Sequence, residues 1–417
     1  MILNAIQTGF ILSGLLFATS IPARAQYPQY QKLKKRTNIA LNITDKKKNP
    51  PRTNFNIGIA SNYPSLNGVG INAISSVTHY DSRGFQLTGF TNITAMQVRG
   101  FQFSGIANVA GKSSKGIILS GLINVNGGSL NGFVLSGIGN MSVKHTRGLI
   151  IGGLINMAGQ QAEGILLSGI ANVSKQDQNG IMISGLMNAS GDTIRGLQLA
   201  SLLNIAGETN NGVQLAILGN ANTTNQGLQL SACNFSVKNK GIQIGITNLT
   251  GEGEKGLQLG FVNLSTDSLT HQVGCINITP RTRIQLLITG GNMNKINLAV
   301  RFKNQHTYTE LGGGAYYFDL NHDLSASAFY RVGIYYPLLS QLGISADAGF
   351  YHIETLNNKN KGYPARAYAL QPRLNVEYWV NKRLGFFVSG GYSWTRPYER
   401  KHLLNHKATF EAGIILF

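Results

Sequence analysis

The feature that most constrains this sequence is a glycine that returns at a fixed spacing of 16 residues. Nine successive glycines keep this spacing and three more follow at 15, 14 and 15 residues: Gly84, Gly100, Gly116, Gly132, Gly148, Gly164, Gly180, Gly196 and Gly212, then Gly227, Gly241 and Gly256. Each opens the pattern Gly-φ-x-φ-small-Gly-φ-x-Asn-φ, where φ is an apolar residue. A repeat of this regularity predicts an architecture of stacked units.

An asparagine recurs inside the repeat with the same regularity. It occupies Asn92, Asn108, Asn124, Asn140, Asn156, Asn172, Asn188, Asn204 and Asn220, and continues at Asn234, Asn248, Asn263 and Asn277. The φ-x-φ stretch alternates like a β-strand, and the small-Gly pair interrupts it like a bend. A unit this short has no room for a helix and a strand. We therefore predict a β-solenoid of about 14 short repeats over residues 55–279, with an asparagine ladder along its stack.

Stacking also predicts where the other repeated side chains lie. The glycines and small residues permit tight corners, where the backbone angle φ can be positive. Hydrophobic residues such as Leu119, Leu135, Ile151 and Leu167 are expected to form one apolar spine. The alternative is a large antiparallel barrel with one strand per repeat, but the broken alternation and the constant spacing favour the solenoid.

From residue 280 the sequence becomes rich in aromatic residues and includes both tryptophans, Trp379 and Trp394. Eight alternating segments are predicted strands: 284–289, 296–303, 307–318, 325–336, 342–353, 366–380, 384–395 and 408–417. Leu374 and Val376 share an apolar face, whereas Arg373 and Glu377 share a polar one. Strands of this length with apolar and polar faces predict an eight-stranded antiparallel outer-membrane β-barrel over residues 280–417. A soluble β-sandwich is the alternative with the same alternation.

The polar face of the predicted barrel carries charges of both signs. They are Arg301, Glu310, Arg331, Asp347, Arg373 and Glu377. A barrel of eight strands is filled by its own side chains, and buried charges need partners. We therefore expect these residues to form a structural salt-bridge network in the lumen rather than a conduction path.

The predicted connections between barrel strands indicate an orientation. The odd-numbered connections are the longer ones, and such barrels have short periplasmic turns and long external loops. This parity puts both barrel termini, and with them the solenoid, in the periplasm. One missed strand, for which residues 271–279 are the candidate, would reverse the result and make the repeats surface-exposed.

The N-terminal residues predict export. Met1–Ala25 has the apolar run and the Ala23-Arg-Ala25 cleavage site of a secretory signal peptide, although no Lys or Arg precedes the run. Residues 26–54 hold eight basic residues against Asp45 alone, which predicts a basic disordered tail. The tail is either a contact for anionic lipid, lipopolysaccharide or acidic glycan, or a solvated linker.

The repeats lack a recognisable catalytic pattern. Their acidic residues, Asp81, Glu163, Asp177, Asp192, Glu208, Glu252, Glu254 and Asp267, lie in the variable polar segments and form no recurring carboxylate pair. We predict no catalytic residues, no cofactor and no metal site. Cys233 and Cys275 lie three repeats apart, too far for a disulfide, and are predicted to be free thiols that serve as packing residues.

Two of the units, Gly196-Leu-Gln-Leu and Gly256-Leu-Gln-Leu-Gly-Phe-Val-Asn263, resemble a bacterial surface-repeat family first named from spirochaete members. The resemblance covers about residues 55–278. It implies a location in the cell envelope and no established activity. The family's name implies the outer surface, in contrast to the loop parity.

The distribution of charge and the predicted export exclude one class of partner. The net charge of +19 is concentrated in the tail and the barrel, and the chain is predicted to be exported, so nucleic acid is an unsuitable partner. We expect a non-enzymatic cell-envelope protein, anchored in the outer membrane by the barrel, whose repeats bind or space something. Expected partners are outer-membrane lipid or lipopolysaccharide, a glycan or another envelope protein. The alternatives are a carbohydrate-active solenoid enzyme and a small outer-membrane transporter.

Overall fold

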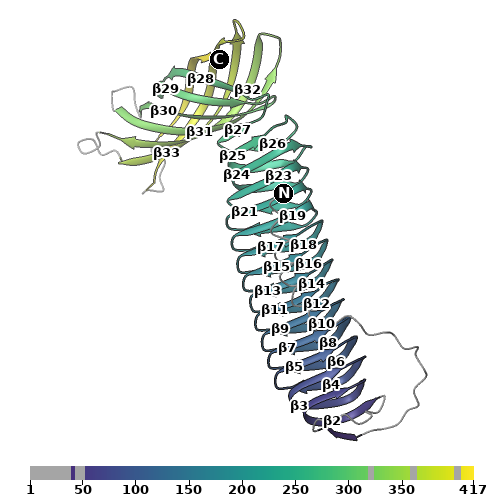
Figure 1. The fold of residues 1–417 in the computed structure, drawn as a ribbon. Coiled ribbons are helices and arrows are strands. Elements are labelled where there is room, and N and C mark those ends of the chain that lie inside the picture. The colour runs from purple at the N-terminus through teal and green to yellow at the C-terminus, as the bar shows by residue number, and fades with distance from the viewer. Residues whose placement is uncertain (1–38, 43–51, 318–323, 357–363, 399–404) are drawn as a thin grey trace. The chain divides into compact units, whose positions relative to one another are not determined.

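The computed structural model describes residues 39–42, 52–317, 324–356, 364–398 and 405–417, and these residues form strands, turns and bends without a helix (Figure 1). The predicted signal peptide and most of the predicted basic tail lie outside the described residues. The chain divides into two compact units after Val237. The fold is a parallel β-solenoid followed by a closed antiparallel β-barrel, as the sequence predicts.

The first unit is a stack of coils, most of which contribute one longer and one shorter strand. Its strands are β1 (Ile39–Asn42), β2 (Thr53–Tyr63), β3 (Leu66–Thr78), β4 (Ser82–Thr88), β5 (Thr91–Thr94), β6 (Gln97–Ser104), β7 (Ala107–Ala110), β8 (Ser113–Ser120), β9 (Ile123–Asn126), β10 (Leu130–Ser136), β11 (Gly139–Ser142), β12 (Thr146–Gly152), β13 (Ile155–Ala158), β14 (Ala162–Ser168), β15 (Ala171–Ser174), β16 (Gln178–Ser184), β17 (Met187–Ser190), β18 (Ile194–Ala200), β19 (Leu203–Asn210), β20 (Val213–Ala216), β21 (Gly219–Asn225) and β22 (Leu228–Leu230). The strand β23 (Cys233–Asn239) spans the boundary between the units.

Each strand of the regular coils pairs in parallel with the equivalent strand of the next coil. In β8, β10 and β12 the partners are Gly116, Gly132 and Gly148, and in β9 and β11 they are Asn124 and Asn140. The register therefore equals the sequence repeat, and identical residues stack along the coils.

The repeat glycine is required by both its conformation and its surroundings. Gly132 has a φ of 117°, and a Cβ added there would overlap the carbonyl oxygen of Gly116 in the preceding coil. An L-amino acid with a side chain avoids this φ, and the neighbouring backbone leaves no room for one. This pair of constraints explains why the position is invariant in the regular array.

Two parts of the predicted tail, residues 39–42 and 53–54, belong to the solenoid, the second as the start of β2. Ile39–Asn42 forms β1 and pairs in parallel with Phe55 to Gly58 of β2. The prediction of a disordered tail over residues 26–54 is therefore wrong for these two segments. The alternating Ile39 and Leu41 suit a strand, and the open edge of β2 offers unpaired backbone groups to it.

The predicted apolar spine stacks in register but faces outward. Leu119, Leu135, Ile151 and Leu167 are direct partners in neighbouring coils, yet Leu135 is 39% exposed. The residue before each of them points inward instead, because successive side chains of a strand alternate between its two faces. These inward residues are Ile118, Val134, Ile150 and Leu166, and they form the apolar part of the interior.

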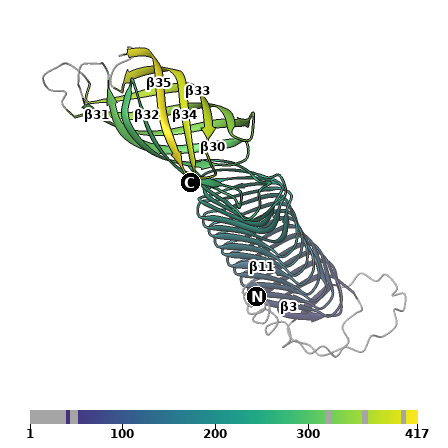
Figure 2. The ribbon, with the colours of Figure 1, turned by 90° about the horizontal axis from the view of Figure 1, so that it is seen from above.

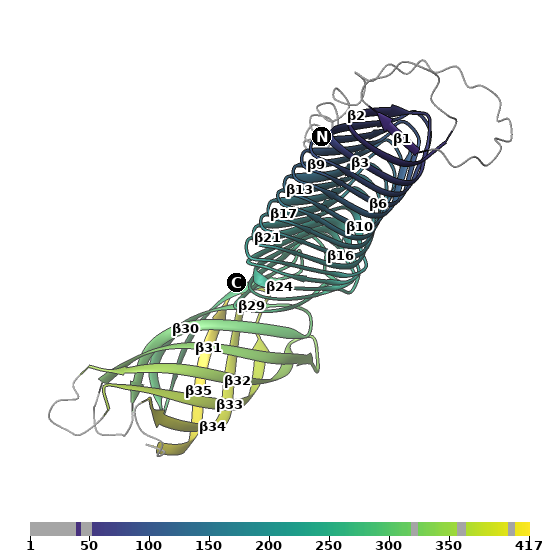
Figure 3. The ribbon, with the colours of Figure 1, turned by 90° about the horizontal axis from the view of Figure 1, so that it is seen from below.

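The second unit begins with further parallel strands and ends in the barrel (Figure 2, Figure 3). The parallel strands are β24 (Ile242–Gly253), β25 (Leu257–Ser265), β26 (His271–Val273) and β27 (Ile276–Ile278). The barrel strands are β28 (Arg283–Gly291), β29 (Asn294–Lys303), β30 (Thr307–Tyr317), β31 (Leu324–Pro337), β32 (Leu342–Thr355), β33 (Arg366–Trp379), β34 (Leu384–Pro397) and β35 (Asn405–Leu416). Antiparallel pairing of β28 with β35 closes the ring.

The barrel has the predicted even number of strands. The segment 271–279, the candidate for a missed barrel strand, forms β26 and β27, which pair in parallel with β25. Both barrel ends of the chain therefore lie on one rim. The first predicted connection is wrong in length, since only residues 292–293 separate β28 from β29. Residues 290–295 look like a loop in sequence, but backbone pairing with β35 extends β28 through Gly291.

Candidate functional site

The interior of the solenoid contains a continuous asparagine ladder. The Asn124 side-chain amide donates one hydrogen bond to Asn140 Oδ1 at 2.8 Å and another to the carbonyl oxygen of Leu135 at 3.0 Å. The same pair of bonds recurs from Asn92 through Asn204, coil by coil. All nine predicted asparagines are buried, and Asn220 continues the ladder to Asn234. Their amides thus tie each coil to the next.

A second polar ladder runs beside the asparagines at both ends of the array. Gln102 donates to Gln86 at 3.0 Å, and Gln214 donates to Gln198 at 3.1 Å. In the second unit Gln258 donates to Gln243 and Gln272 donates to Gln258. Gln198 and Gln258 belong to the Gly-Leu-Gln-Leu units of the sequence, but no glutamine ladder was predicted from them. In the central coils the equivalent position, two residues after the repeat glycine, holds an aliphatic residue such as Val134. Where it holds glutamine instead, the interior of the solenoid is polar.

Near the first coils a buried tyrosine joins this polar interior. Tyr63 is 1% exposed, and its hydroxyl lies 2.6 Å from Ser76 Oγ and accepts a hydrogen bond from Gln86. Burial raises the pKa of Tyr63 above its ordinary value of 10.0, although hydrogen bonds from Ser76 and Gln86 oppose the shift. The tyrosine therefore stays neutral at physiological pH.

The barrel interior brings together all six predicted lumen residues. Arg301 contacts Glu377 at 2.7 Å and Glu310 at 3.3 Å. Arg331 contacts Asp347 at 2.6 Å, and Arg373 bridges Asp347 at 2.9 Å and Glu310 at 3.4 Å. The six side chains, which come from β29 to β33, are nearly inaccessible to solvent. They make one connected network of ion pairs.

Two charged residues of this network were missed in the sequence. Lys303 contacts Glu377 at 2.9 Å, and Glu411 contacts Arg373 at 2.6 Å. Glu411 lies on the inward face of β35, between the outward Phe410 and Ala412, so the alternation of that strand could have identified it. With these additions the described lumen holds four cations and four anions, which balance in charge.

Apolar and aromatic side chains fill the remaining barrel interior. Tyr316, Phe329, Tyr351 and Phe387 pack in one buried cluster, with the rings of Phe329 and Tyr351 stacked at 4.7 Å. Tyr351 also accepts hydrogen bonds from Arg331 at 2.7 and 3.1 Å. The outward residues of the same strands, among them Ile334, Leu374, Val388 and Phe410, are exposed. The barrel is thus polar and packed inside and apolar outside.

Five of the eight acidic residues of the repeats pair with cations. The five ion pairs join Asp81 to Arg83, Glu163 to Arg147, Asp177 to Arg195, Glu252 to Lys238 and Glu254 to Lys240. The hydrogen bond from Lys240 lowers the pKa of Glu254. Within the described ranges, no three His, Cys, Asp or Glu side chains are grouped so that they could hold a metal ion.

Cys233 and Cys275 are both free thiols, as predicted. Cys233 is exposed, so the prediction that it is a packing residue is wrong: its strand turns this side chain outward. Cys275 is partly buried, and burial raises the pKa of its thiol.

No helix in the described part of the chain is long and apolar enough to cross a membrane.

Comparison with known proteins gives only weak structural similarity. No family model matches the sequence, and no curated protein matches it. Among solved structures, one chain from the de novo design of transmembrane β-barrels is similar, with 14% identity over 33% of this chain and 95% of that chain. The TM-score is 0.23, and a similarity of this degree carries no argument about function.

Proposed function

We propose that this chain is a non-enzymatic bacterial cell-envelope protein whose barrel is an anchor in the outer membrane and whose solenoid binds or spaces envelope components. The observation that carries the proposal is the inverted polarity of the barrel. Four ion-paired cations and four anions face inward, whereas Ile334, Leu374 and Phe410 face outward. A closed ring of strands satisfies its backbone groups internally, as a hydrocarbon environment requires.

The packed lumen favours anchoring over transport. An eight-stranded ring has an interior just wide enough for side chains. Here the charged network and the aromatic cluster around Tyr351 occupy that interior. Conduction through the lumen would require these buried ion pairs to break, and each broken pair costs on the order of 3–5 kcal/mol.

The proposed membrane location is tested by separating inner and outer membranes from the host bacterium on a density gradient. The protein should appear in the outer-membrane fraction and resist extraction with carbonate or high salt. Recovery in the soluble periplasmic fraction would overturn the proposal. An overexpressed soluble periplasmic protein serves as the control for leakage.

Three of the four odd-numbered connections support a periplasmic location for the solenoid, whereas the first, residues 292–293, is shorter than every even-numbered one. Residues 318–323, 356–365 and 398–404 form the third, fifth and seventh connections, and the second, fourth and sixth are the shorter segments 304–306, 338–341 and 380–383. The shorter turns of such barrels face the periplasm, and the barrel's two chain ends share their rim. Protease added to intact cells should leave the repeats uncut, and cutting should follow permeabilisation. Loss of the repeats from cells with a sealed outer membrane would refute this orientation.

A further inference from the structure

The solenoid exposes apolar side chains on both of its strand faces and on the corner between them. They stand one, three, six and nine residues after the repeat glycine, and we call this surface the apolar edge. Its exposed members in the regular coils include Phe85, Phe90, Ile93, Phe103, Ile106, Ile117, Leu122, Phe133, Leu135, Ile138, Leu154, Ile165, Ile170, Ile183, Leu186, Leu199 and Leu202. Each of these 17 side chains is 36–49% exposed, and together they exceed the apolar patch of a few hundred Å² usual for a monomer.

The corner residues form the ridge of the apolar edge. Leu122, Ile138, Leu154 and Ile170 stand at the same place in four successive coils and are 40–45% exposed. Small glycines such as Gly121 and Gly137 precede them, so the apolar side chains dominate the ridge. The ridge therefore runs along the stack as a continuous row.

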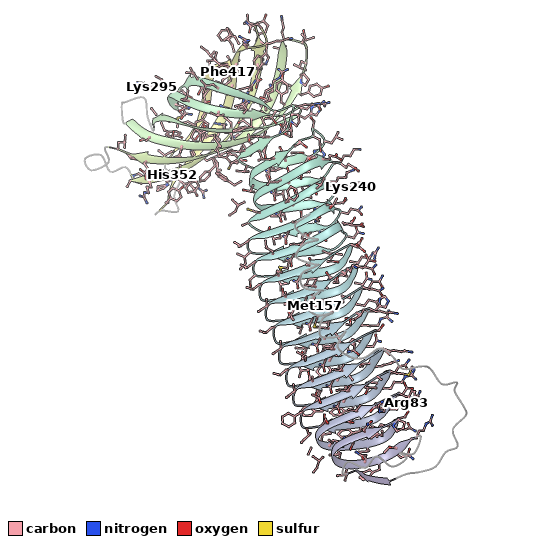
Figure 4. The ribbon with its side chains drawn as sticks, in the orientation of Figure 1. Arg83, Met157, Lys240, Lys295, His352 and Phe417 are labelled. Atoms are coloured by element: carbon pink, nitrogen blue, oxygen red, sulfur yellow. The ribbon has the colours of Figure 1, made fainter. Side chains whose placement is uncertain are left out.

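The opposite side of the coils is polar and carries charges of both signs, with Arg83 paired to Asp81 and Arg147 to Glu163. Lys112 and Lys144 stand twelve residues after the repeat glycine, and Lys115 and Arg147 stand immediately before the next one. Arg83 occupies the equivalent position in an earlier coil, and its side chain projects away from the strands (Figure 4). The coil is thus amphipathic in cross-section, with cations flanking the apolar faces.

The backbone of the apolar edge is already satisfied. At the corner the amide of Ile138 donates to the carbonyl oxygen of Leu122 at 2.8 Å, and the amide of Leu154 donates to that of Ile138 at 2.8 Å. The strands on either side of the corner pair in parallel with the equivalent strands of the neighbouring coils, so their backbone groups are also bonded along the stack. Unsatisfied backbone groups are what exclude most folds from hydrocarbon, so this surface meets the requirement for contact with lipid.

We propose that the apolar edge of the solenoid lies in a lipid leaflet, with the cations of the flanking positions at the anionic headgroups. A second copy of the chain would cover one flat face and leave the other face and the ridge exposed. A lipid phase covers a convex edge from both sides. Lys and Arg next to such an edge reach phosphate groups with their charged ends while their aliphatic stems stay in apolar surroundings.

Site-directed spin labelling of the full chain in vesicles of phosphatidylethanolamine and phosphatidylglycerol tests this inference. The background carries Cys233→Ser and Cys275→Ser. Leu122→Cys places the label on the ridge, and Lys115→Cys places the matched control on the cationic side of the same coil. The label at 122 should be more accessible to oxygen than to a water-soluble nickel complex, and the label at 115 should show the reverse order.

Two results would overturn the inference. One is equal access of the nickel complex to both labels. The other is protection of position 122 from both reagents together with spin–spin broadening that disappears on dilution with unlabelled protein, which would identify a second copy as the occupant. Ile138→Cys with Asn131→Cys repeats the comparison in the next coil if the first pair disturbs folding.

The inference rests on the proposed insertion of the barrel into the same membrane, and the two can fail separately. The mobility of the unheated protein on a gel reports barrel insertion in each sample. A sample with an inserted barrel and an aqueous label at 122 refutes the lipid contact alone. A sample without a folded barrel refutes the proposed function.

Discussion

At the scale of single residues, the repeat glycine and the buried asparagine make each coil depend on the one before it. The glycine lets the backbones approach, and the asparagine joins coils through side-chain amides. Both act at every step of the array, so a single substitution affects two interfaces between coils. This dependence can be measured directly.

Gly132→Ala should destabilise the solenoid by about 2 kcal/mol or more, because alanine is strained at a φ of 117° and its Cβ meets the Gly116 carbonyl oxygen. Chemical unfolding followed by circular dichroism measures the loss. Asn131→Ala changes the adjacent, partly exposed residue and is the control. Equal stability of the two variants would contradict the role assigned to the glycine.

Asn156→Ala removes the hydrogen bonds donated to Ile150 O, Leu167 O and Asn172 Oδ1, and leaves the Asn140 amide without its ladder acceptor. We expect a loss of about 2–4 kcal/mol in the free energy of unfolding, since buried polar groups are left unpaired. Asn179→Ala, on the outer side of β16, should cost less than about 0.5 kcal/mol. A neutral effect of Asn156→Ala would show that the ladder contributes nothing to stability.

Tyr63 gives the solenoid a dependence on alkaline pH. Because burial raises its pKa in the folded state above 10.0, its contribution to stability is complete below pH 10.0 and is lost as the pH rises toward the folded-state pKa. Tyr63→Phe should flatten the fall in stability that begins as the pH rises above 10.0. Identical pH profiles for the wild-type protein and the variant would contradict this prediction.

At the scale of elements, Glu377 links two strands of the barrel, since from β33 it pairs with Arg301 and Lys303 of β29. Glu377→Gln should destabilise the folded barrel by about 3 kcal/mol, because buried Lys303 loses its anion and Arg301 keeps only Glu310. Glu354→Gln on β32 is the control: its partner Arg366 is exposed, so the expected cost is below about 1 kcal/mol. The temperature at which the unheated gel band is lost measures both. The prediction fails if the two variants lose that band at the same temperature.

The strands also show which features of the fold can be predicted from sequence patterns. Spacing alone predicts the solenoid register, since each repeat glycine stacks on the next, and alternation predicts all eight barrel strands within a few residues. Alternation does not say which face of a solenoid strand is buried, so Leu135 was expected in a spine and lies outside. Nor does local sequence reveal pairing between distant segments, which adds β1 to β2 and extends β28 along β35.

At the scale of the whole molecule, both units bury polar side chains beside an apolar cluster and expose further apolar side chains on their outer surfaces. The solenoid buries asparagine and glutamine ladders, and the barrel buries ion pairs such as Arg331 with Asp347. Each unit's outer apolar surface is suited to lipid more than to water. We therefore predict that the extracted protein aggregates when detergent is removed and stays dispersed when lipid replaces it, as monitored by light scattering. Full dispersion in plain buffer would contradict this expectation.

The central claim, a closed barrel folded in the outer membrane, is tested most directly by heat-modifiable mobility of the protein extracted from that membrane. The unheated sample should migrate faster than the boiled one on a gel, because the folded barrel stays compact in detergent. A single band at the same position before and after boiling, in protein recovered from the outer membrane, would contradict the account.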